Sequence, residues 1–168
     1  MDSLLEELRQ KPKKHILFVC LGNICRSSAA ETVMNALVRE AGRENEFIND
    51  SAGLISYHQG ELADPRMRAH AARRGYDITH RSRPVRTLDF FDFDLIVGMD
   101  DRNIDALHEK APSPETERKI VRMTDFCQLK MADYVPDPYY GGAQGFETVL
   151  DLLEDACQGL LQRLTTSL

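Results

Sequence analysis

The sequence predicts an α/β fold, a doubly wound single domain in which a central four-stranded parallel sheet is flanked by helices on both faces. Two observations support this class. Short apolar runs rich in β-branched and aromatic residues alternate along the chain with longer segments of helical periodicity, which is the order of a parallel sheet with right-handed crossovers. The length of 168 residues fits one domain with a sizeable core, and the sequence contains no internal repeat.

Four runs have the composition of strands. Residues 15–20 and 94–98 are short, almost continuous apolar runs, as expected for strands that are covered on both faces of a parallel sheet. Residues 47–51 and 119–123 are shorter and more polar, but each lies between two segments of helical pattern. We therefore expect four strands, with the first run buried on both faces of the sheet.

Four segments between and after these runs predict helices. The first begins at Arg26 and repeats apolar residues every three or four positions until Gly42, a suitable stop. Residues 64–74 form a helix ended by Gly75, and residues 101–110 form one that stops before Pro112. The last helix, over 146–164, has one apolar face that includes Cys157, which we expect to be a buried small hydrophobe.

Residues 1–14 precede the first strand and are expected to be an N-terminal extension, with the domain itself over 15–168. Leu4, Leu5 and Leu8 have the spacing of a short amphipathic helix. We interpret the segment as a flexible or surface-docked extension, and a helix that binds a partner as the alternative. Its charges are interleaved with its leucines, unlike a secretion signal, so we expect a cytoplasmic protein.

Charge and cysteine content exclude several classes. The net charge is −6; residues 1–86 hold 14 basic and 11 acidic side chains (+3), and residues 87–168 hold 7 and 16 (−9). An acidic chain is a poor binder of nucleic acid, whose affinity comes from many Lys and Arg contacts. The apolar runs are far too short for membrane insertion. Four scattered cysteines fit neither a disulfide scaffold nor a structural zinc site, so no metal is expected.

The joint between the first strand and the first helix is the most informative segment. It reads Cys20-Leu-Gly-Asn-Ile-Cys-Arg26-Ser27. It is neither a Walker loop nor a dinucleotide-binding fingerprint. It places a cysteine at the end of a strand and an arginine six positions later, where a helix begins. Ligands of open parallel sheets bind beyond the carboxyl ends of the strands, so this loop is the predicted site.

The residue types of this loop suit phosphate chemistry. A short loop that turns back to a helix N-terminus directs several N–H groups toward one point and has a positive helix dipole behind it. Arg26 adds a planar donor for two phosphate oxygens. The same positive field favours the thiolate of Cys20, which can then attack phosphorus. Ser27 can donate a hydrogen bond to that sulfur.

These residues resemble the active-site signature of the low-molecular-weight protein tyrosine phosphatases. The resemblance begins at VCLGNICRSSAAE and extends over about residues 15–165. It implies an enzyme that hydrolyses phosphotyrosine and small aryl phosphates through a cysteinyl phosphate, without a cofactor, and releases inorganic phosphate. Further matching motifs lie at Asp50-Ser-Ala-Gly53, Tyr57-His-x-Gly60, Asp64-Pro-Arg-Met67, His80-Arg-Ser-Arg83, Asp89-Phe90, Phe93-Asp-Leu-Ile, Met99-Asp-x-x-Asn103 and Asp137-Pro-Tyr-Tyr-Gly141.

The resemblance assigns roles to particular residues. Cys20 is the nucleophile, Arg26 the phosphate ligand and Asp137 the general acid, which then acts as the base that activates water. The other members of the phosphate-binding loop are Leu21, Gly22, Asn23, Ile24, Cys25 and Ser27. A hydrogen-bond network that includes Asn23, Ser51 and His80 supports this loop and orients Ser27. The residues of the substrate cleft are Tyr57, Tyr139 and Tyr140. Cys25 would also form a reversible redox pair with Cys20.

Neighbouring residues complete the expectations. Glu31 and Asp50 could keep His80 charged. Most arginines between residues 66 and 86 are expected on a solvated face, where they could steer acidic phosphopeptides. The partners implied are phosphotyrosine proteins or peptides, with no nucleic acid, and the chain is expected to be a monomer.

Three alternatives remain on the same fold. Arsenate reduction would need two further cysteines after the middle strands, which the sequence lacks. Phosphoarginine phosphatases tend to carry threonine before the second loop cysteine, where this chain has Ile24. A catalytically dead phosphotyrosine-binding module is disfavoured because Cys20, Arg26 and Asp137 are all present.

Overall fold

The computed structural model describes residues 1–139 and 141–165 and contains the predicted four-stranded parallel sheet. The strand order is β2-β1-β3-β4, and every neighbouring pair is parallel. The strands are β1 (Lys14–Cys20), β2 (Phe47–Gly53), β3 (Leu95–Gly98) and β4 (Ile120–Arg122). The direction of winding reverses between β1 and β3, and a crevice at the carboxyl edge of the sheet is expected there.

Strand β1 lies in the interior of the sheet and contributes to two cores. Ile16 and Phe18 pack in the larger apolar cluster on one face, whereas Leu17 and Val19 pack in a smaller cluster on the other face. All four side chains are fully buried. The continuous apolar run that predicted a doubly covered strand therefore follows from the alternation of side chains across the sheet.

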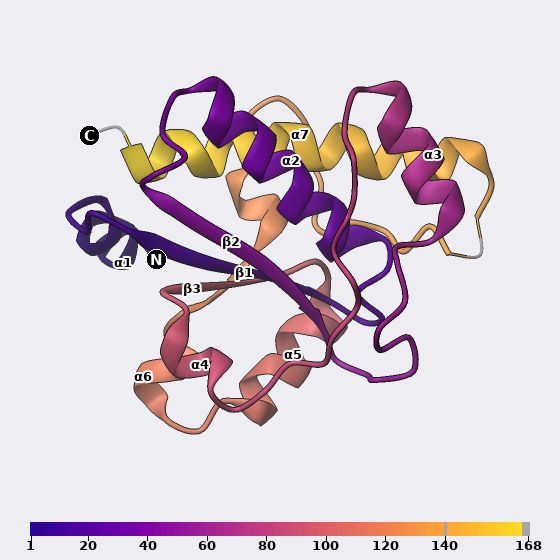
Figure 1. Ribbon diagram of the computed structural model, residues 1–168. Coiled ribbons are helices and arrows are strands. Elements are labelled where there is room, and N and C mark those ends of the chain that lie inside the picture. Colours follow the sequence, from indigo (N-terminus) through magenta and orange to yellow (C-terminus); the bar gives the residue numbers. More distant parts are fainter. Residues whose placement is uncertain (140, 166–168) are drawn as a thin grey trace.

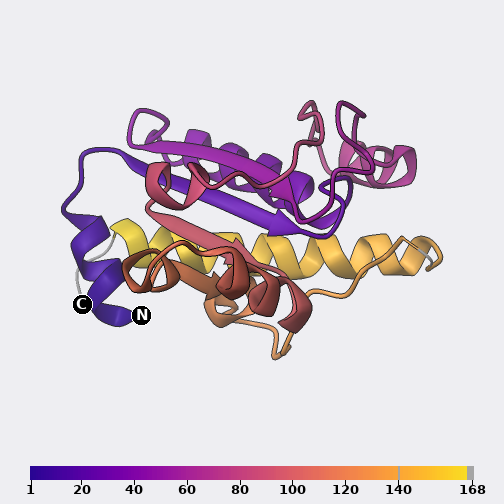
Figure 2. The same cartoon turned by 90° about the horizontal axis from the view of Figure 1, so that it is seen from below.

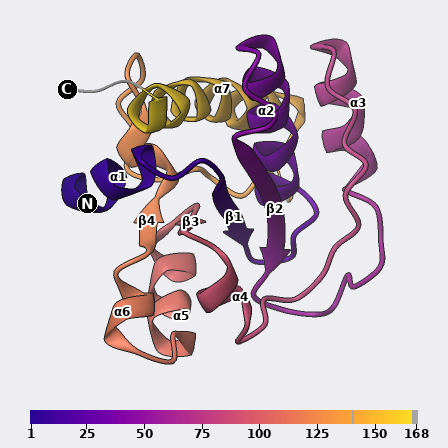
Figure 3. The ribbon, with the colours of Figure 1, turned by 60° about the vertical axis from the view of Figure 1, so that its left-hand side comes forward.

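Helices cover both faces of the sheet, which confirms the predicted sandwich (Figures 1 and 3). One face is covered by α2 (Arg26–Glu40) and α7 (Ala143–Thr165), and α3 (Pro65–Arg73) packs against α7. On the opposite side lie α4 (Asp89–Asp92), α5 (Asp101–Lys110) and α6 (Pro114–Glu117). No helix within residues 1–139 and 141–165 is both long and apolar enough to cross a membrane.

The N-terminal segment forms a helix, α1 (Asp2–Arg9), that packs against α7. Leu4, Leu5 and Leu8 are buried in the larger core, as their spacing indicated. The Arg9 side chain donates a hydrogen bond of 2.9 Å to the backbone carbonyl oxygen of Arg163 in α7. Figure 2 shows α1 at the end of the sheet where β1 begins, away from the carboxyl edge. The segment is therefore docked on the domain surface.

The structure extends or trims several predicted elements. Strand β2 continues two residues beyond the predicted end, to Gly53, and β4 is limited to Ile120–Arg122. The residues after β4 form a 3₁₀ helix, η1 (Met123–Phe126), which the sequence analysis assigned in part to the strand. Helices α4 and α6 were not predicted, because four residues are too few to show a periodicity. The last helix begins at Ala143, three residues earlier than predicted.

Candidate active site

The predicted phosphate loop lies at the carboxyl end of β1, beside the point where the sheet reverses direction. Cys20 is the last residue of β1, and α2 begins at Arg26, as the sequence indicated. Between them, Asn23 has a φ of 59°, a left-handed conformation that asparagine tolerates better than most residues. This residue reverses the chain within five positions, so the loop closes around a small space.

The loop carbonyl oxygens are turned outward. Those of Leu21, Gly22 and Ile24 accept hydrogen bonds of 2.8 to 3.1 Å from the surrounding chain. The donors are the backbone N–H groups of Leu54, Ile55 and Asp64 and the hydroxyl of Ser82. The described peptide bonds are all trans, so the N–H of each such peptide unit points the opposite way, toward the inside of the loop. These inward N–H groups form a cradle for an anion.

The Cys20 thiol is held by Ser27. Its sulfur lies 3.0 Å from the Ser27 hydroxyl and accepts a hydrogen bond from the Ser27 backbone N–H at 3.4 Å. The Ser27 oxygen accepts a hydrogen bond from the Asn23 side-chain nitrogen at 2.7 Å. Because Asn23 donates to the Ser27 oxygen, the hydroxyl proton of Ser27 can be directed to the sulfur at 3.0 Å or to the Ala52 carbonyl oxygen at 3.5 Å. The hydroxyl and the N–H of Ser27 are thus the two hydrogen-bond donors nearest the sulfur.

Arg26 brings a buried positive charge to the same space. Its side chain is only 3% exposed and donates to a carboxylate oxygen of Asp100 at 2.7 Å and to the carbonyl oxygen of Val135 at 3.1 Å. Both contacts use Nη1. The other terminal nitrogen, Nη2, lies 3.6 Å from the carboxylate of Asp137. The guanidinium is thus held by the carboxylate of Asp100 and forms a second ion pair with that of Asp137.

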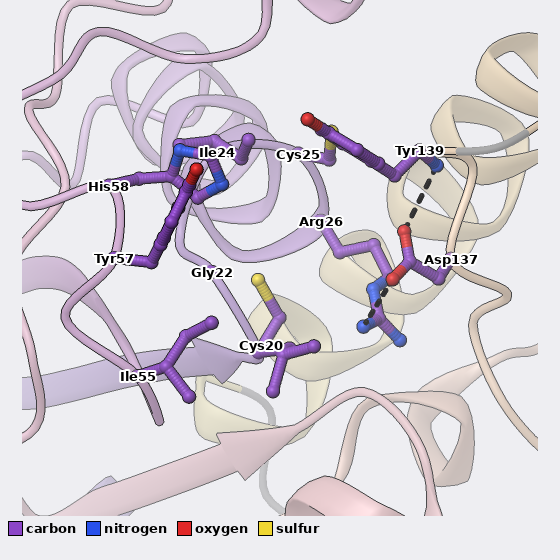
Figure 4. Close-up of a pocket in the computed structure, with 11 residues that line it drawn as sticks. Cys20, Gly22, Ile24, Cys25, Arg26, Ile55, Tyr57, His58, Asp137 and Tyr139 are labelled. Atoms are coloured by element: carbon purple, nitrogen blue, oxygen red, sulfur yellow. Dashed lines mark hydrogen bonds and ion pairs between the residues drawn. The ribbon is translucent and has the colours of Figure 1, made fainter.

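Asp137 lies opposite the phosphate loop, on the segment between η1 and α7. One carboxylate oxygen accepts a hydrogen bond from the Tyr139 N–H at 3.0 Å, a local turn that orients the side chain. The side chain is 40% exposed, so it can exchange protons with water. Figure 4 shows Asp137 and Arg26 together on one side of the pocket, with the sulfur of Cys20 directed into it.

These groups line one cavity of about 310 Å³. The wall opposite Asp137 is formed by Ile55, Tyr57 and His58, and Tyr139 lies on the side of the acid (Figure 4). Tyr57 is 82% exposed, and its ring meets that of His58 edge to face. An aryl group that enters the cavity would therefore contact aromatic and aliphatic side chains before its phosphate reaches the loop.

A second layer of hydrogen bonds supports the loop through Asn23. The Asn23 side-chain oxygen accepts from the His80 Nε2–H at 2.9 Å and from the Arg83 N–H at 3.1 Å. His80 Nδ1 lies 3.2 Å from Glu31 and 3.4 Å from Asp50. The imidazole thus connects two carboxylates to the loop, and it fixes which way the Asn23 amide faces.

Burial changes the protonation of this layer. Desolvation raises the pKa of Glu31 from 4.5 to about 7 and lowers the pKa of His80. Both shifts favour the uncharged form of the group, because burial makes a charge on either side chain costly. Glu31, Asp50 and His80 also have the residue types of metal ligands and lie within 4.8 Å of one another. Each of the three already has hydrogen-bond or ion-pair partners within the protein, so we assign them to the support of the phosphate loop.

The chain has close relatives among phosphatases. Residues 15–168 match the family described as low molecular weight phosphotyrosine protein phosphatase. The chain belongs to this family. A putative low molecular weight protein-tyrosine-phosphatase of Synechocystis is 46% identical over 149 residues, which cover 89% of this chain and 95% of the relative. A human low molecular weight phosphotyrosine protein phosphatase is 32% identical over 156 residues, 93% of this chain and 99% of the relative.

Solved structures give the same family and fold. A crystal structure of a protein tyrosine phosphatase from Entamoeba histolytica, with Hepes in its active site, superimposes with a TM-score of 0.88 at 47% identity. The match covers 90% of this chain and 97% of that structure. A Drosophila arginine phosphatase superimposes with a TM-score of 0.85 at 30% identity, and the match covers 90% of this chain and 98% of that structure. The fold therefore also carries phosphoarginine chemistry, and the side chains must decide the substrate.

The structure of this phosphatase brings most of the predicted site residues together. Cys20, Arg26, Asp137, Tyr57 and Tyr139 share the cavity. The loop residues Leu21, Gly22, Ile24 and Cys25 also line it, whereas Asn23 and Ser27 lie behind it and are fully buried. Tyr140 lies outside the described residues.

Ser51 is connected to the predicted hydrogen-bond network through Glu31. Its hydroxyl donates to Glu31 at 2.7 Å, and the same carboxylate lies 3.2 Å from His80 Nδ1. This contact follows from the place of Ser51 in β2, from which the side chain points toward α2.

Sequence reasoning missed Asp100, which fixes Arg26 in this phosphatase. It lies just beyond β3, at the same edge of the sheet as the phosphate loop, and it caps α5 by accepting from the Asn103 N–H at 2.8 Å. An acidic residue between a buried strand and a helix start was a usable signal, because carboxyl ends of neighbouring strands share a site. Asp100 is part of the Met99-Asp-x-x-Asn103 motif.

Proposed function

We propose that this phosphatase hydrolyses phosphotyrosine in proteins and peptides, and small aryl phosphates, through a cysteinyl phosphate on Cys20. One observation carries the proposal. A sulfur with two hydrogen-bond donors, a loop of inward N–H groups, a buried arginine and a solvent-accessible carboxyl group all meet in one cavity. These are the groups that phosphoryl transfer to a thiolate and back to water requires.

In the first step the phosphate is held by the loop N–H groups and Arg26, and the Cys20 thiolate attacks phosphorus. The sulfur–phosphorus bond forms as the bond from phosphorus to the tyrosyl oxygen breaks. Asp137 gives its proton to the departing oxygen, which leaves as neutral tyrosine. Electrostatic stabilisation of the three equatorial oxygens comes from the N–H groups and Arg26.

In the second step water attacks the phosphorus of the cysteinyl phosphate. The Asp137 carboxylate takes a proton from that water, and the sulfur leaves as a thiolate with inorganic phosphate as the product. The Ser27 hydroxyl, 3.0 Å from the sulfur, stabilises the leaving thiolate. Each role in both steps is filled by a side chain or a backbone group of this chain, so the proposal invokes no cofactor.

The cavity wall supports an aryl substrate. Tyr57, Ile55 and Tyr139 line the entrance with ring and aliphatic surface, which favours a flat aromatic group by stacking and burial. The residue before Cys25 is Ile24, which also lines the cavity and has no side-chain oxygen to accept a hydrogen bond from the N–H groups of a phosphorylated guanidinium. This favours phosphotyrosine over phosphoarginine.

A substrate panel tests the proposal. Phosphotyrosine, phosphoserine and phosphoarginine peptides and arsenate are each offered to wild type and to Cys20→Ser. We expect wild type to hydrolyse only phosphotyrosine at a high rate. Cys20→Ser should abolish turnover and retain binding of inorganic phosphate, because the loop N–H groups and Arg26 remain. Turnover by Cys20→Ser, or faster hydrolysis of phosphoarginine by wild type, would contradict the proposal.

We also propose that Cys25 protects Cys20 during oxidation. Both residues line the cavity, and burial raises the pKa of Cys25, so it is a thiol at neutral pH. Peroxide would oxidise the Cys20 thiolate to a sulfenic acid and release water or hydroxide. Attack by the Cys25 sulfur would then form a disulfide and release water. Recovery by a dithiol should be complete in wild type and incomplete in Cys25→Ser; identical recovery would reject the pair.

Three remaining expectations accompany this function as proposals. We propose that residues 1–14 are an extension of a phosphatase domain over 15–168, that the enzyme works as a monomer, and that it acts in the cytoplasm. All four cysteines are free, which suits a reducing compartment. Sedimentation of the full chain at micromolar concentration tests the monomer.

A further inference from the structure

Arg66, at the start of α3, has a side chain that is 47% exposed but whose guanidinium is held by several contacts. Its guanidinium grips the carboxylate of Asp64 with two nitrogens: Nε donates at 3.1 Å and Nη2 at 2.9 Å. Asp64 is 7% exposed and caps α3 by accepting from the Arg66 N–H at 2.8 Å. Because the two prongs engage one buried carboxylate, the plane of the guanidinium is fixed.

The same guanidinium reaches the segment that carries the proposed acid. Its Nη2 donates to the carbonyl oxygen of Tyr139 at 2.7 Å. The guanidinium carbon lies 5.5 Å from the centre of the Tyr139 ring and 4.9 Å from that of Phe146 in α7. Tyr139 in turn donates its N–H to the carboxylate of Asp137. Arg66 therefore holds the residue whose backbone orients the acid.

The Asp64–Arg66 pair is attached to the phosphate loop as well. The Asp64 N–H donates to the carbonyl oxygen of Ile24 at 2.8 Å. One short segment at the start of α3 thus binds the phosphate loop on one side and the acid segment on the other. The phosphate loop and the acid segment are more than one hundred residues apart in the sequence, and this connection joins them in addition to the contacts of Arg26 with Val135 and Asp137.

We propose that Arg66 is a positioning residue for proton transfer by Asp137. Its role rests on the proposed phosphotyrosine hydrolysis: it holds the acid segment at the distance from which Asp137 can protonate the departing tyrosyl oxygen. An exposed ion pair that only adds stability would contribute little and would affect all substrates alike. A positioning role affects only the step in which a proton moves, because small displacements of a catalytic group are costly.

The test compares two substrates of different leaving group. The value of kcat/KM reports formation of the phosphoenzyme, in which a phosphotyrosine peptide needs a proton from Asp137 and 2,4-dinitrophenyl phosphate does not. Arg66→Met keeps an unbranched apolar side chain beside Phe146 and removes the donors and the positive charge. We expect it to lower kcat/KM about 10-fold for the peptide and less than about 3-fold for the dinitrophenyl ester.

Arg68 provides the matched control. It is an exposed arginine two positions along the same helix, so Arg68→Met makes the same chemical change without touching the acid segment. It should leave kcat/KM for both substrates unchanged. Equal losses on both substrates in Arg66→Met, or no loss on the peptide, would overturn the positioning role. Absence of peptide hydrolysis in wild type would instead refute the proposed function.

A double-mutant cycle gives the decisive comparison. In an Asp137→Asn background there is no acid left to position, so Arg66→Met should cause no further loss on the peptide. An additional 10-fold loss in that background would contradict the proposal. Arg66→Lys serves if Arg66→Met melts below the assay temperature, because lysine cannot bridge Asp64 and Tyr139 in the same geometry. The loss of kcat/KM caused by Arg66→Lys should likewise be absent in the Asp137→Asn background.

Discussion

The contribution of α1 to stability can be measured through Leu5. This side chain is fully buried between α1 and the rest of the core. Replacing a buried leucine with alanine costs about 2–5 kcal/mol. An eight-residue helix has no independent stability in water, so α1 persists only through this docking. The ion pairs of α1, such as Glu7 with Arg118, are exposed and add little. We therefore expect Leu5→Ala to lower the free energy of unfolding by about 3 kcal/mol.

Thermal and chemical unfolding test this value. For a chain of this size a loss of about 3 kcal/mol corresponds to about 6–12 °C in Tm. Leu129→Ala is the control, because Leu129 is 88% exposed and its replacement should change stability by less than about 0.5 kcal/mol. Phosphatase activity of Leu5→Ala below its Tm should equal that of wild type, since α1 lies at the far end of β1 from Cys20 (Figure 1).

Two results would refute this reasoning. A Tm within 2 °C of wild type, our threshold for no effect, would mean that α1 is not coupled to the fold. A fall in kcat/KM at a temperature where Leu5→Ala remains folded would mean that α1 also acts on the site. Either outcome would require a different account of residues 1–14, including the partner-binding helix that the sequence left as an alternative.

Three further predictions concern single side chains. Gly159→Ala should lower the free energy of unfolding in urea by about 3 kcal/mol or more, because a Cβ would lie 1.8 Å from the Phe126 carbonyl oxygen. Alanine normally stabilises a helix relative to glycine, so the sign is opposite to the usual one. A loss below about 1 kcal/mol would contradict this. Asp100→Asn should lower kcat/KM about 10-fold, because Arg26 loses the carboxylate that orients it, and unchanged kcat/KM would remove that role. Burial raises the pKa of Glu31 from 4.5 to about 7, so the native state retains a proton that the unfolded chain releases. As pH rises from 4.5 to 7, the free energy of unfolding of wild type should therefore fall by up to about 3 kcal/mol relative to that of Glu31→Gln. Parallel curves of unfolding free energy against pH for the two proteins would refute this prediction.

Elements with a strong local pattern could be predicted from the sequence. The apolar run of β1 and the helical period after Arg26 specify a buried strand and its helix without any tertiary information. Helix α5 has the predicted bounds, Asp101–Lys110, because Asp100 caps its start and the segment before Pro112 ends it. Four-residue elements such as α4 carry no such pattern, and only packing against the sheet defines them.

The active site also has a local part, which the sequence pattern predicts, and long-range contacts, which it does not. The phosphate loop is local, so one stretch of sequence contains the proposed nucleophile, the glycine and the arginine. The contacts that hold it are not local: Asp100 lies 74 positions from Arg26, and Tyr139 lies 73 positions from Arg66. No spacing rule predicts such pairs, because they depend on which strands become neighbours. Sequence reasoning therefore predicted the phosphate loop and its support by Asn23 and His80, but it did not predict the long-range contacts of Asp100 and Arg66.

The central claim is that phosphate is transferred to Cys20. It can be tested by acid quench of Asp137→Asn during turnover of 2,4-dinitrophenyl phosphate, followed by peptide mass spectrometry. The variant should accumulate phosphoenzyme, because the ester needs no acid to leave and the base for hydrolysis is absent. The account predicts one phosphoryl group on the peptide that contains Cys20. Phosphate on another residue, or continued turnover with no phosphoenzyme, would contradict it.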